Sequence, residues 1–190
     1  MRRFLAFVLI LGSILGLVVY GPIEARQAAA TPTPAPTATP AKLATPKPQV
    51  KQGQDGPTKA ELEVWRITNQ QRKAHGLAEL AWSNELWCAA RRHSEDMAAK
   101  GYFEHISLDG RTVRERAYEC GYRGDVSENI GKNITLLGGL GLRPEAIVDG
   151  WMHSPGHKEN LLYPDWKEIG IGYAAGGVWG YYTQDFGSGR

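Results

Sequence analysis

Two histidines four residues apart are the first residues in this sequence whose spacing suggests chemistry. His153 and His157 lie in the segment GWMHSPGHKENLL, residues 150–162. On a helix this spacing would put both imidazoles on one face, as zinc-binding pairs require. Pro155 and Gly156 lie between them, and these are the two residue types least able to continue a helix. The spacing alone therefore does not define a metal site, and other ligands are needed.

Further candidate ligands lie in short polar segments that we expect at the ends of elements or in loops, where side chains can converge. His105 belongs to YFEHIS and Glu128 to SENI, and His157 completes the set. Two imidazoles and one carboxylate are the ligands of many zinc sites that keep a position open for water or substrate. The three residues together suggest a site for zinc or another divalent cation.

The first 57 residues differ in composition from the rest of the chain. Residues 1–30 have a basic start and an apolar run from 4 to 19, which is the pattern of a secretory signal peptide. The run is just short of the ~17 to 20 residues that cross a bilayer, so an uncleaved membrane anchor is the alternative. Residues 31–57 hold seven of the eleven prolines and predict a semi-rigid linker. We expect a secreted protein or one anchored to the cell surface.

Residues 58–190 have the length of one ordinary domain. They contain all six tryptophans and all five histidines. Six of the 22 Lys and Arg and two of the 20 Asp and Glu precede them, so the domain has sixteen basic and eighteen acidic residues. It lacks the basic surface typical of nucleic-acid binding, and we expect no nucleic-acid partner. Cys88 and Cys120 are either one disulfide, as in many exported domains, or two buried thiols.

Four helices are predicted between residues 58 and 152. The first spans 58–76 with a capping box at its start, and the second runs from Ser83 to Gly101. Two shorter ones cover residues 111–122 and 143–152.

Polar residues fall on the apolar sides of the first two helices. Asn69 and Arg72 continue a stripe that begins with Leu62 and Trp65. Either that stripe turns to solvent or the two polar residues are buried and hydrogen-bonded. His93 lies on the apolar side of the second helix, and we interpret it as a core histidine that bonds a neighbouring backbone group rather than as a metal ligand.

The C-terminal segment changes from helical to alternating periodicity. Residues 168–187 alternate on either side of Gly176-Gly177, which predicts a β-hairpin. Gly170 and Gly172 share one face of the first strand, where they allow a helix to approach closely. Helices packed on an antiparallel sheet are the expected architecture.

Ten short motifs occur in an order that resembles the bacterial branch of the CAP superfamily, the SCP-like or cysteine-rich secretory, antigen 5 and pathogenesis-related 1 proteins. The resemblance spans residues 62–187, and its motifs run N69-x-x-R72, HGL, LAW, HSEDMA, YFEH, GY, SENI, WMHSPGHKENLL, IGIGY and YYTQDFG. The resemblance implies the α/β class and an α-β-α sandwich, with an antiparallel central sheet flanked by helices.

The resemblance also bears on the candidate site. Well-studied members have a cavity of two histidines and two acids, and His105 and Glu128 fall on two of those positions. Ser154 stands where the family has its second acid, and Tyr181 stands where it has its second histidine. His157, in the SPGH segment typical of the bacterial branch, supplies the missing imidazole. Together with Tyr181, these residues form the expected ligand-binding site.

Two functions fit this site. One is a binding module that takes a divalent metal and an extracellular ligand such as a cell-wall fragment, a peptide or a lipid. The other is a metal-assisted hydrolase of peptide or cell-wall material, with Glu128 as ligand or base. No motif supports a Ser or Cys nucleophile. The cluster has only one assigned carboxylate, which gives little support to a glycosidase that needs a pair of acids. We favour binding, and we expect His153 to remain at the end of its helix without binding metal.

Overall fold

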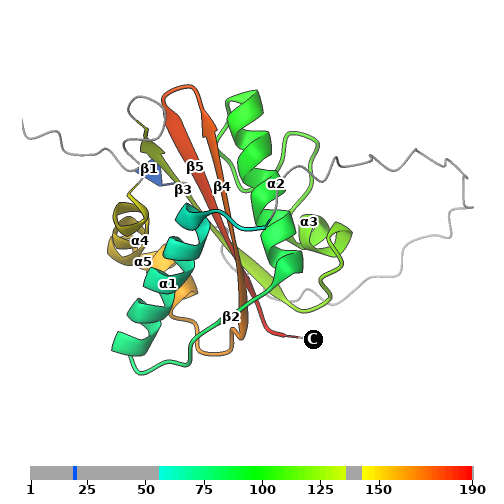
Figure 1. Ribbon diagram of the computed structural model, residues 1–190. Helices are drawn as coiled ribbons and strands as arrows, with labels where there is room; N and C mark the ends of the chain where they lie inside the picture. The colour runs from blue at the N-terminus through cyan, green and yellow to red at the C-terminus, as the bar shows by residue number, and fades with distance from the viewer. Residues whose placement is uncertain (1–18, 21–55, 136–142, 190) are drawn as a thin grey trace, which may run out of the picture.

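The computed structural model describes residues 19–20, 56–135 and 143–189 (Figure 1). Most of the expected leader or anchor (residues 1–30, with the apolar run 4–19) and of the linker (31–57) lies outside these residues. Within the described part of the chain, no helix is both long enough and apolar enough to cross a membrane. The elements follow in the order β1 (Val19–Tyr20), α1 (Lys59–Ala74), β2 (Ala81–Trp82), α2 (Asn84–Lys100), α3 (Val113–Glu119), β3 (Val126–Ile134), α4 (Pro144–His153), α5 (Pro155–Leu161), β4 (Glu168–Gly176) and β5 (Trp179–Gly187).

The four predicted helices form as the capping signals indicate. Thr58 and Glu61 make the predicted capping box at the start of α1. Ser83 caps α2, and Gly101 ends it in the left-handed conformation that glycine favours. Helix α5 was not predicted. It begins at Pro155, because proline is well tolerated in the first turn of a helix even though it ends the preceding one.

The sheet is mixed, so the expectation of an antiparallel sheet is only partly right. Its strand order is β1-β3-β5-β4-β2. β3, β5 and β4 pair antiparallel, and β4 and β5 form the predicted hairpin. β2 pairs in parallel with β4, through Ala81 and Trp82. Two residues are too few to show an alternating pattern, so this strand was not predicted.

The helices cover both faces of the sheet and make an α-β-α sandwich, as Figure 1 shows. α2 and α3 lie on one face, and α1, α4 and α5 lie on the other. The predicted close approach of a helix to the glycine face is confirmed. A Cβ atom built on Gly170 would lie 2.0 Å from the backbone nitrogen of Trp87, and one on Gly172 would lie 2.2 Å from the backbone of Ala90. Side chains at these positions would push α2 off the sheet.

The polar residues of the α1 stripe are buried and hydrogen-bonded. Asn69 exchanges two hydrogen bonds with the backbone of Leu80. Arg72 donates to the carbonyl groups of Ala78, Leu161 and Tyr163. These bonds tie α1 to the loop that follows it and to the end of α5. Of the two alternatives for the stripe, burial of Asn69 and Arg72 is therefore correct.

Cys88 on α2 and Cys120 at the end of α3 form a disulfide, which resolves the choice between a bridge and two thiols. The sulfur atoms join two helices on the same face of the sheet. The bridge closes a loop between positions 32 apart in the sequence. It therefore restricts the unfolded chain as well as linking the two helices.

Reducing the disulfide is expected to lower the free energy of unfolding by about 3 to 4 kcal/mol. The intact bridge restricts a loop of this length in the unfolded chain, and reduction gives that configurational freedom back to the unfolded state. The melting temperature should fall by about 10 °C or more. Thermal unfolding with and without reductant measures the change. A Cys88→Ser/Cys120→Ser variant should match the reduced protein and show no further response to reductant. An unchanged melting temperature in both experiments would contradict the expectation.

Candidate functional site

Glu128 lies within strand β3, so its expected position at a segment end or in a loop is wrong. Its Cα pairs across the sheet with Asp185 of β5, and the two side chains point to the α2 face. This strand was not predicted, because the segment VSENIGKNI has no alternation of apolar and polar residues. Its polar side chains are accommodated on both covered faces of the sheet. Glu128 is only 6% exposed.

Glu128 is the centre of a buried cluster. Its Oε1 accepts a hydrogen bond from Nδ1 of His105 at 2.8 Å. Its Oε2 accepts from Nη2 of Arg116, on α3. Nε2 of His93, on α2, lies 3.9 Å from the same oxygen. The loop that follows α2 and helix α3 are thus joined to the sheet through one carboxylate.

Arg116 holds the segment before α3 in place as well. Its Nη1 donates to the carbonyl groups of His105 and Arg111 and to the hydroxyl of Ser107. The arginine is 3% exposed, so these bonds are made away from water. Because Arg116 binds both the backbone of His105 and the carboxylate of Glu128, it fixes the contact between those two residues.

The charges of the cluster favour an ionised Glu128. Burial raises its pKa, but the charge of Arg116, the nearby His93 and the hydrogen bond from His105 outweigh burial and lower the pKa to about 2. Burial lowers the pKa of His93. Neutral His93 donates from Nε2 to the carbonyl of Glu104 at 2.9 Å. The interpretation of His93 as a core histidine bonded to a backbone group is thus correct.

Asp185 is a second carboxyl that the sequence analysis did not assign to the site. It is fully buried beside Glu128. Burial, and after it the negative charge of Glu128, raise the pKa of Asp185 well above its ordinary value. Asp185 is therefore harder to ionise than an ordinary aspartate, while Glu128 is ionised. The sequence contained one signal for its position: residues two apart on a strand share one face, so Asp185 lies on the same face as Thr183 and Tyr181.

His157 lies in the first turn of α5 and is buried. Its Nδ1 is hydrogen-bonded to Oγ of Ser154 at 2.8 Å, and its carbonyl accepts from the side chain of Asn129 on β3. Burial, and then the nearby His105, lower the pKa of His157 to about 4. The two histidines are therefore close enough to interact electrostatically, and His157 is neutral at ordinary pH.

His153 ends α4 and points to solvent. Its side chain is 75% exposed, and Nδ1 donates to the carbonyl of Asp149. Ser154 lies between the two helices, so the chain changes direction before His157. The four-residue spacing does not put the two histidines on one helix face.

Tyr181 shares the α2 face with Asp185 but lies four residues away along β5, about 13 Å. It packs with Met97 and Ile130 in a separate apolar cluster. Its ring lies 6.5 Å from that of Phe103. The structure therefore brings His105 and Glu128 into contact but places Tyr181 at the other end of the sheet.

The cluster offers one nitrogen suited to a metal. Nε2 of His105 is buried and has no hydrogen-bond partner among the described residues, while Nδ1 is held by Glu128. A carboxylate on the far nitrogen is the usual arrangement behind a metal-bound histidine. Both oxygens of Glu128 are engaged, so this residue fits the role of an orienting carboxylate better than that of a direct ligand. Residues 56–135 and 143–189 contain no group of three or more His, Cys, Asp or Glu gathered closely enough to hold an ion.

The fold is thus an α-β-α sandwich. Its candidate site is a buried cluster of histidine, carboxylate and arginine side chains between strand β3 and helices α2 and α3. Residues 65–186 match the CAP family, described as the Cysteine-rich secretory protein family. The chain belongs to this family, and the resemblance inferred from the ten motifs is confirmed.

Similar proteins occur in bacteria. The chain is 35% identical over 130 residues to the uncharacterized membrane protein YlbC of Bacillus subtilis, covering 68% of this chain and 34% of YlbC. It is 34% identical over 129 residues to the uncharacterized protein YkwD of the same organism, covering 66% and 46%. A crystal structure of an extracellular Bacillus anthracis protein containing an SCP domain is 27% identical with a TM-score of 0.57, covering 70% and 45%. The chain thus spans less than half of each of these relatives.

Proposed function

We propose that this protein is a secreted or surface-anchored binding module whose CAP domain takes a divalent metal ion, zinc in the first place, at His105 and His157. The observation that carries the proposal is the buried Nε2 of His105, which has no partner in the described part of the chain. A buried polar atom without a partner is costly, and a metal ion would satisfy it. His157 lies on α5 beside β3 and is near enough to His105 for that residue to lower its pKa, so its imidazole is in the neutral form that binds metals.

Each residue of the cluster has a role in this proposal. Glu128 holds the proton on Nδ1 of His105 and so leaves Nε2 as the ligand atom. Arg116 keeps Glu128 ionised and fixes its position. Ser154 orients the ring of His157 in the same way that Glu128 orients His105. A bound zinc ion would supply a Lewis-acidic position for an extracellular ligand, such as a cell-wall fragment, a peptide or a lipid.

An export or surface location fits the disulfide between Cys88 and Cys120, because such bonds persist in oxidising compartments. It also fits the extracellular Bacillus anthracis protein and the membrane protein YlbC, to which this chain is similar. The apolar run at residues 4–19 would serve as signal peptide or membrane tether.

The hydrolase alternative gains a second carboxyl from Asp185, since paired acids with pKa values driven apart are typical of acid-base catalysis. Asp185 is fully buried and Glu128 nearly so. Neither can reach a substrate bond without a rearrangement of α2, and binding is therefore the better proposal.

Zinc titration of the purified chain by calorimetry tests the metal site. The wild type should bind at micromolar concentrations or tighter, and His105→Ala and His157→Ala should each lose most of the binding. Glu128→Gln should weaken binding by about 10- to 100-fold, the range typical of a carboxylate behind a metal-bound histidine. Binding should weaken on acidification, because protonated histidine does not bind metals. His157, with its pKa near 4, should tolerate lower pH than free imidazole at about 6.5.

His153→Ala is the matched control, because it removes an exposed histidine four residues from His157. This variant should bind zinc as the wild type does. Loss of binding in His153→Ala with retention in His157→Ala would overturn the assignment. A wild-type protein that binds no divalent ion at micromolar concentration would leave the cluster with a purely structural role.

A further inference from the structure

Apolar side chains gather at one end of the sheet, where β3 ends and the β4–β5 hairpin turns. Val178, in the turn, is 60% exposed, and Ile134, at the end of β3, is 37% exposed. Trp179 pairs with Ile134 across the sheet and is half-buried. We call these three residues the hairpin end. Adjoining apolar side chains that remain exposed are typical of a contact surface.

The hairpin end is exposed because α2 ends beside it. Figure 1 shows the turn of the hairpin at the same end of the sheet as the last turn of α2. The helix ends at Gly101, and a Cβ atom built on Gly176 would lie 2.6 Å from the carbonyl oxygen of Ala98. The last turn of α2 therefore covers the hairpin as far as Gly176, and Val178 lies beyond it.

A lysine borders the hairpin end. Lys132 precedes Ile134 by two residues on β3, so the two side chains share one face of the sheet. Nζ of Lys132 lies 4.4 Å from the centre of the Trp179 ring and 5.4 Å from that of the Phe103 ring. A lysine beside a tryptophan, next to exposed aliphatic side chains, is a combination typical of the boundary between a membrane and water.

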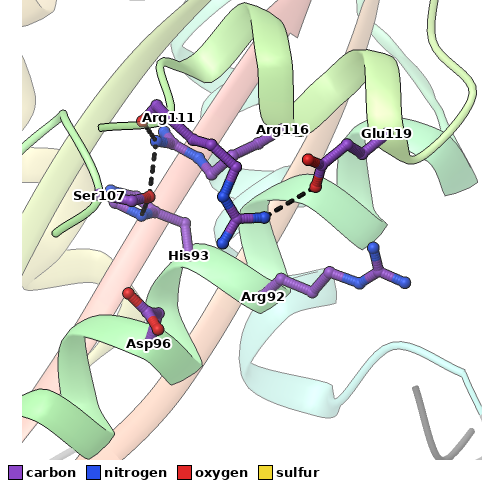
Figure 2. A pocket seen from close by; sticks show the side chains of 7 residues that line it. All are labelled: Arg92, His93, Asp96, Ser107, Arg111, Arg116 and Glu119. Atoms are coloured by element: carbon purple, nitrogen blue, oxygen red, sulfur yellow. Dashed lines mark hydrogen bonds and ion pairs between the residues drawn. The ribbon is translucent and has the colours of Figure 1, made fainter. Parts of the chain in front are cut away.

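Lys132 differs from the arginines further along the α2 face, which have carboxylate partners. Arg116 pairs with Glu128, and Figure 2 shows the guanidinium of Arg111 reaching Glu119. Lys132 makes no ion pair within the part of the chain that the structure describes, where its contacts are with aromatic rings. Its charge is therefore available to an anionic group outside the protein, such as a lipid phosphate.

The apolar run of residues 4–19 joins the described domain next to this surface. Its last residue, Val19, begins β1 and pairs with Lys132, and Tyr20 pairs with Gly131. The pairing is antiparallel, so β1 begins on the side of Lys132 where Ile134 lies. A strand rises about 3.3 Å per residue, which places Ile134 about 7 Å beyond Lys132 on that side. The end of a possible membrane anchor and the hairpin end thus lie together.

We propose that the hairpin end contacts the lipid bilayer, so that the domain rests on the membrane to which residues 4–19 anchor it. Val178, Ile134 and Trp179 enter the boundary between headgroups and acyl chains, to the depth of about 5 to 10 Å that interfacial segments reach. Lys132 meets lipid phosphate at the surface. The proposal rests on the membrane-tether alternative of the proposed function and is independent of the zinc site.

A fluorescent label at position 178 tests this contact in the full chain. The two cysteines of the chain are bonded to each other, so Val178→Cys adds its only free thiol. The variant is labelled with a polarity-sensitive fluorophore and reconstituted in vesicles of phosphatidylcholine and phosphatidylglycerol. We expect the emission to shift to shorter wavelength, and lipids that carry a nitroxide just below the headgroup to quench most of it.

Tyr118→Cys is the matched control, because Tyr118 is 61% exposed, against 60% for Val178. It lies on α3 near the other end of the sheet, where Tyr122 accepts a hydrogen bond from the backbone of Gly189, just after β5. A label there should emit as in water and escape quenching. Adding Ile134→Asp to Val178→Cys should remove most of the quenching at position 178, because a carboxylate is costly to place among acyl chains.

Three results would overturn the proposal. Emission as in water at both positions, without quenching, would show that the domain stands away from the bilayer on the linker of residues 31–57. Equal quenching at both positions would show lipid contact that does not depend on the hairpin end. A shift at position 178 without quenching by the nitroxide lipids would show that a second copy of the chain covers this surface. None of these results bears on zinc binding at His105.

Discussion

Replacing Glu128 by Gln is expected to lower the free energy of unfolding by about 3 to 5 kcal/mol at neutral pH, because it leaves the buried Arg116 without its counter-charge. The arginine is 3% exposed and cannot turn to water for compensation. The hydrogen bond that fixes His105 would be weakened as well. Urea unfolding followed by circular dichroism measures the loss.

The matched variant is Asp185→Asn, an acid-to-amide change at the neighbouring position across the sheet. We expect it to leave the protein equally stable or to stabilise it at neutral pH. Burial and the charge of Glu128 raise the pKa of Asp185 in the folded protein only, so folding works against its ionisation. An amide has no charge to form and so removes that cost.

The two carboxyls have opposite pH dependences. The pKa of Glu128 is lowered from 4.5 to about 2, so its stabilising effect is complete above pH 4.5 and is lost as the pH falls toward 2. The pKa of Asp185 is raised from 3.8, so its contribution is favourable below pH 3.8 and is lost as the pH rises. Asp185→Asn should therefore gain on the wild type as the pH rises above 4. A loss of stability in Asp185→Asn comparable to that in Glu128→Gln would show that both residues are ionised.

Gly172→Ala is expected to destabilise the domain by about 3 kcal/mol or more, at the upper end of the cost of overpacking a core. The added Cβ would lie 2.2 Å from the backbone carbon and oxygen of Ala90. No change of side-chain conformation relieves a clash with backbone, so α2 must move away from β4. Its displacement would also shift His93 relative to Glu128.

The control for this substitution is Ala175→Ser, three residues further along β4 at an exposed position. Surface changes of this kind alter stability by no more than about 0.5 kcal/mol. Thermal unfolding of both variants gives the comparison. If Gly172→Ala melted within a degree or two of the wild type, the close packing of α2 on β4 would be incorrect.

Local signals in the sequence were sufficient for most of the elements. The capping box at Thr58, the cap at Ser83 and the hairpin around Gly177 each act within a few residues, and each predicted its element correctly. Strand β3 was missed because both of its faces are covered and its polar residues have buried partners. The two-residue strand β2 depends wholly on pairing with β4, which lies far away in the sequence.

The site was predictable only in part for a related reason. His105 and Glu128 were found through motifs, and their contact agrees with that prediction. Arg116 was missed because it meets Glu128 only after α3 has packed beside β3, and no local pattern marks an arginine for burial. Tyr181 was expected at the site by its position in a motif, yet along β5 it lies about 13 Å from Asp185.

The strand order has a consequence for how the protein is made. β5 is the last strand along the chain, yet it lies at the centre of the sheet and pairs with both β3 and β4. While a ribosome is still translating the residues before 179, β3 and β4 have no common partner, and the buried face of α2 has only part of its sheet. Contacts between segments so far apart in sequence form slowly. The nascent domain should therefore stay open until translation reaches β5, and its folding should be complete only after the last of these strands has been made.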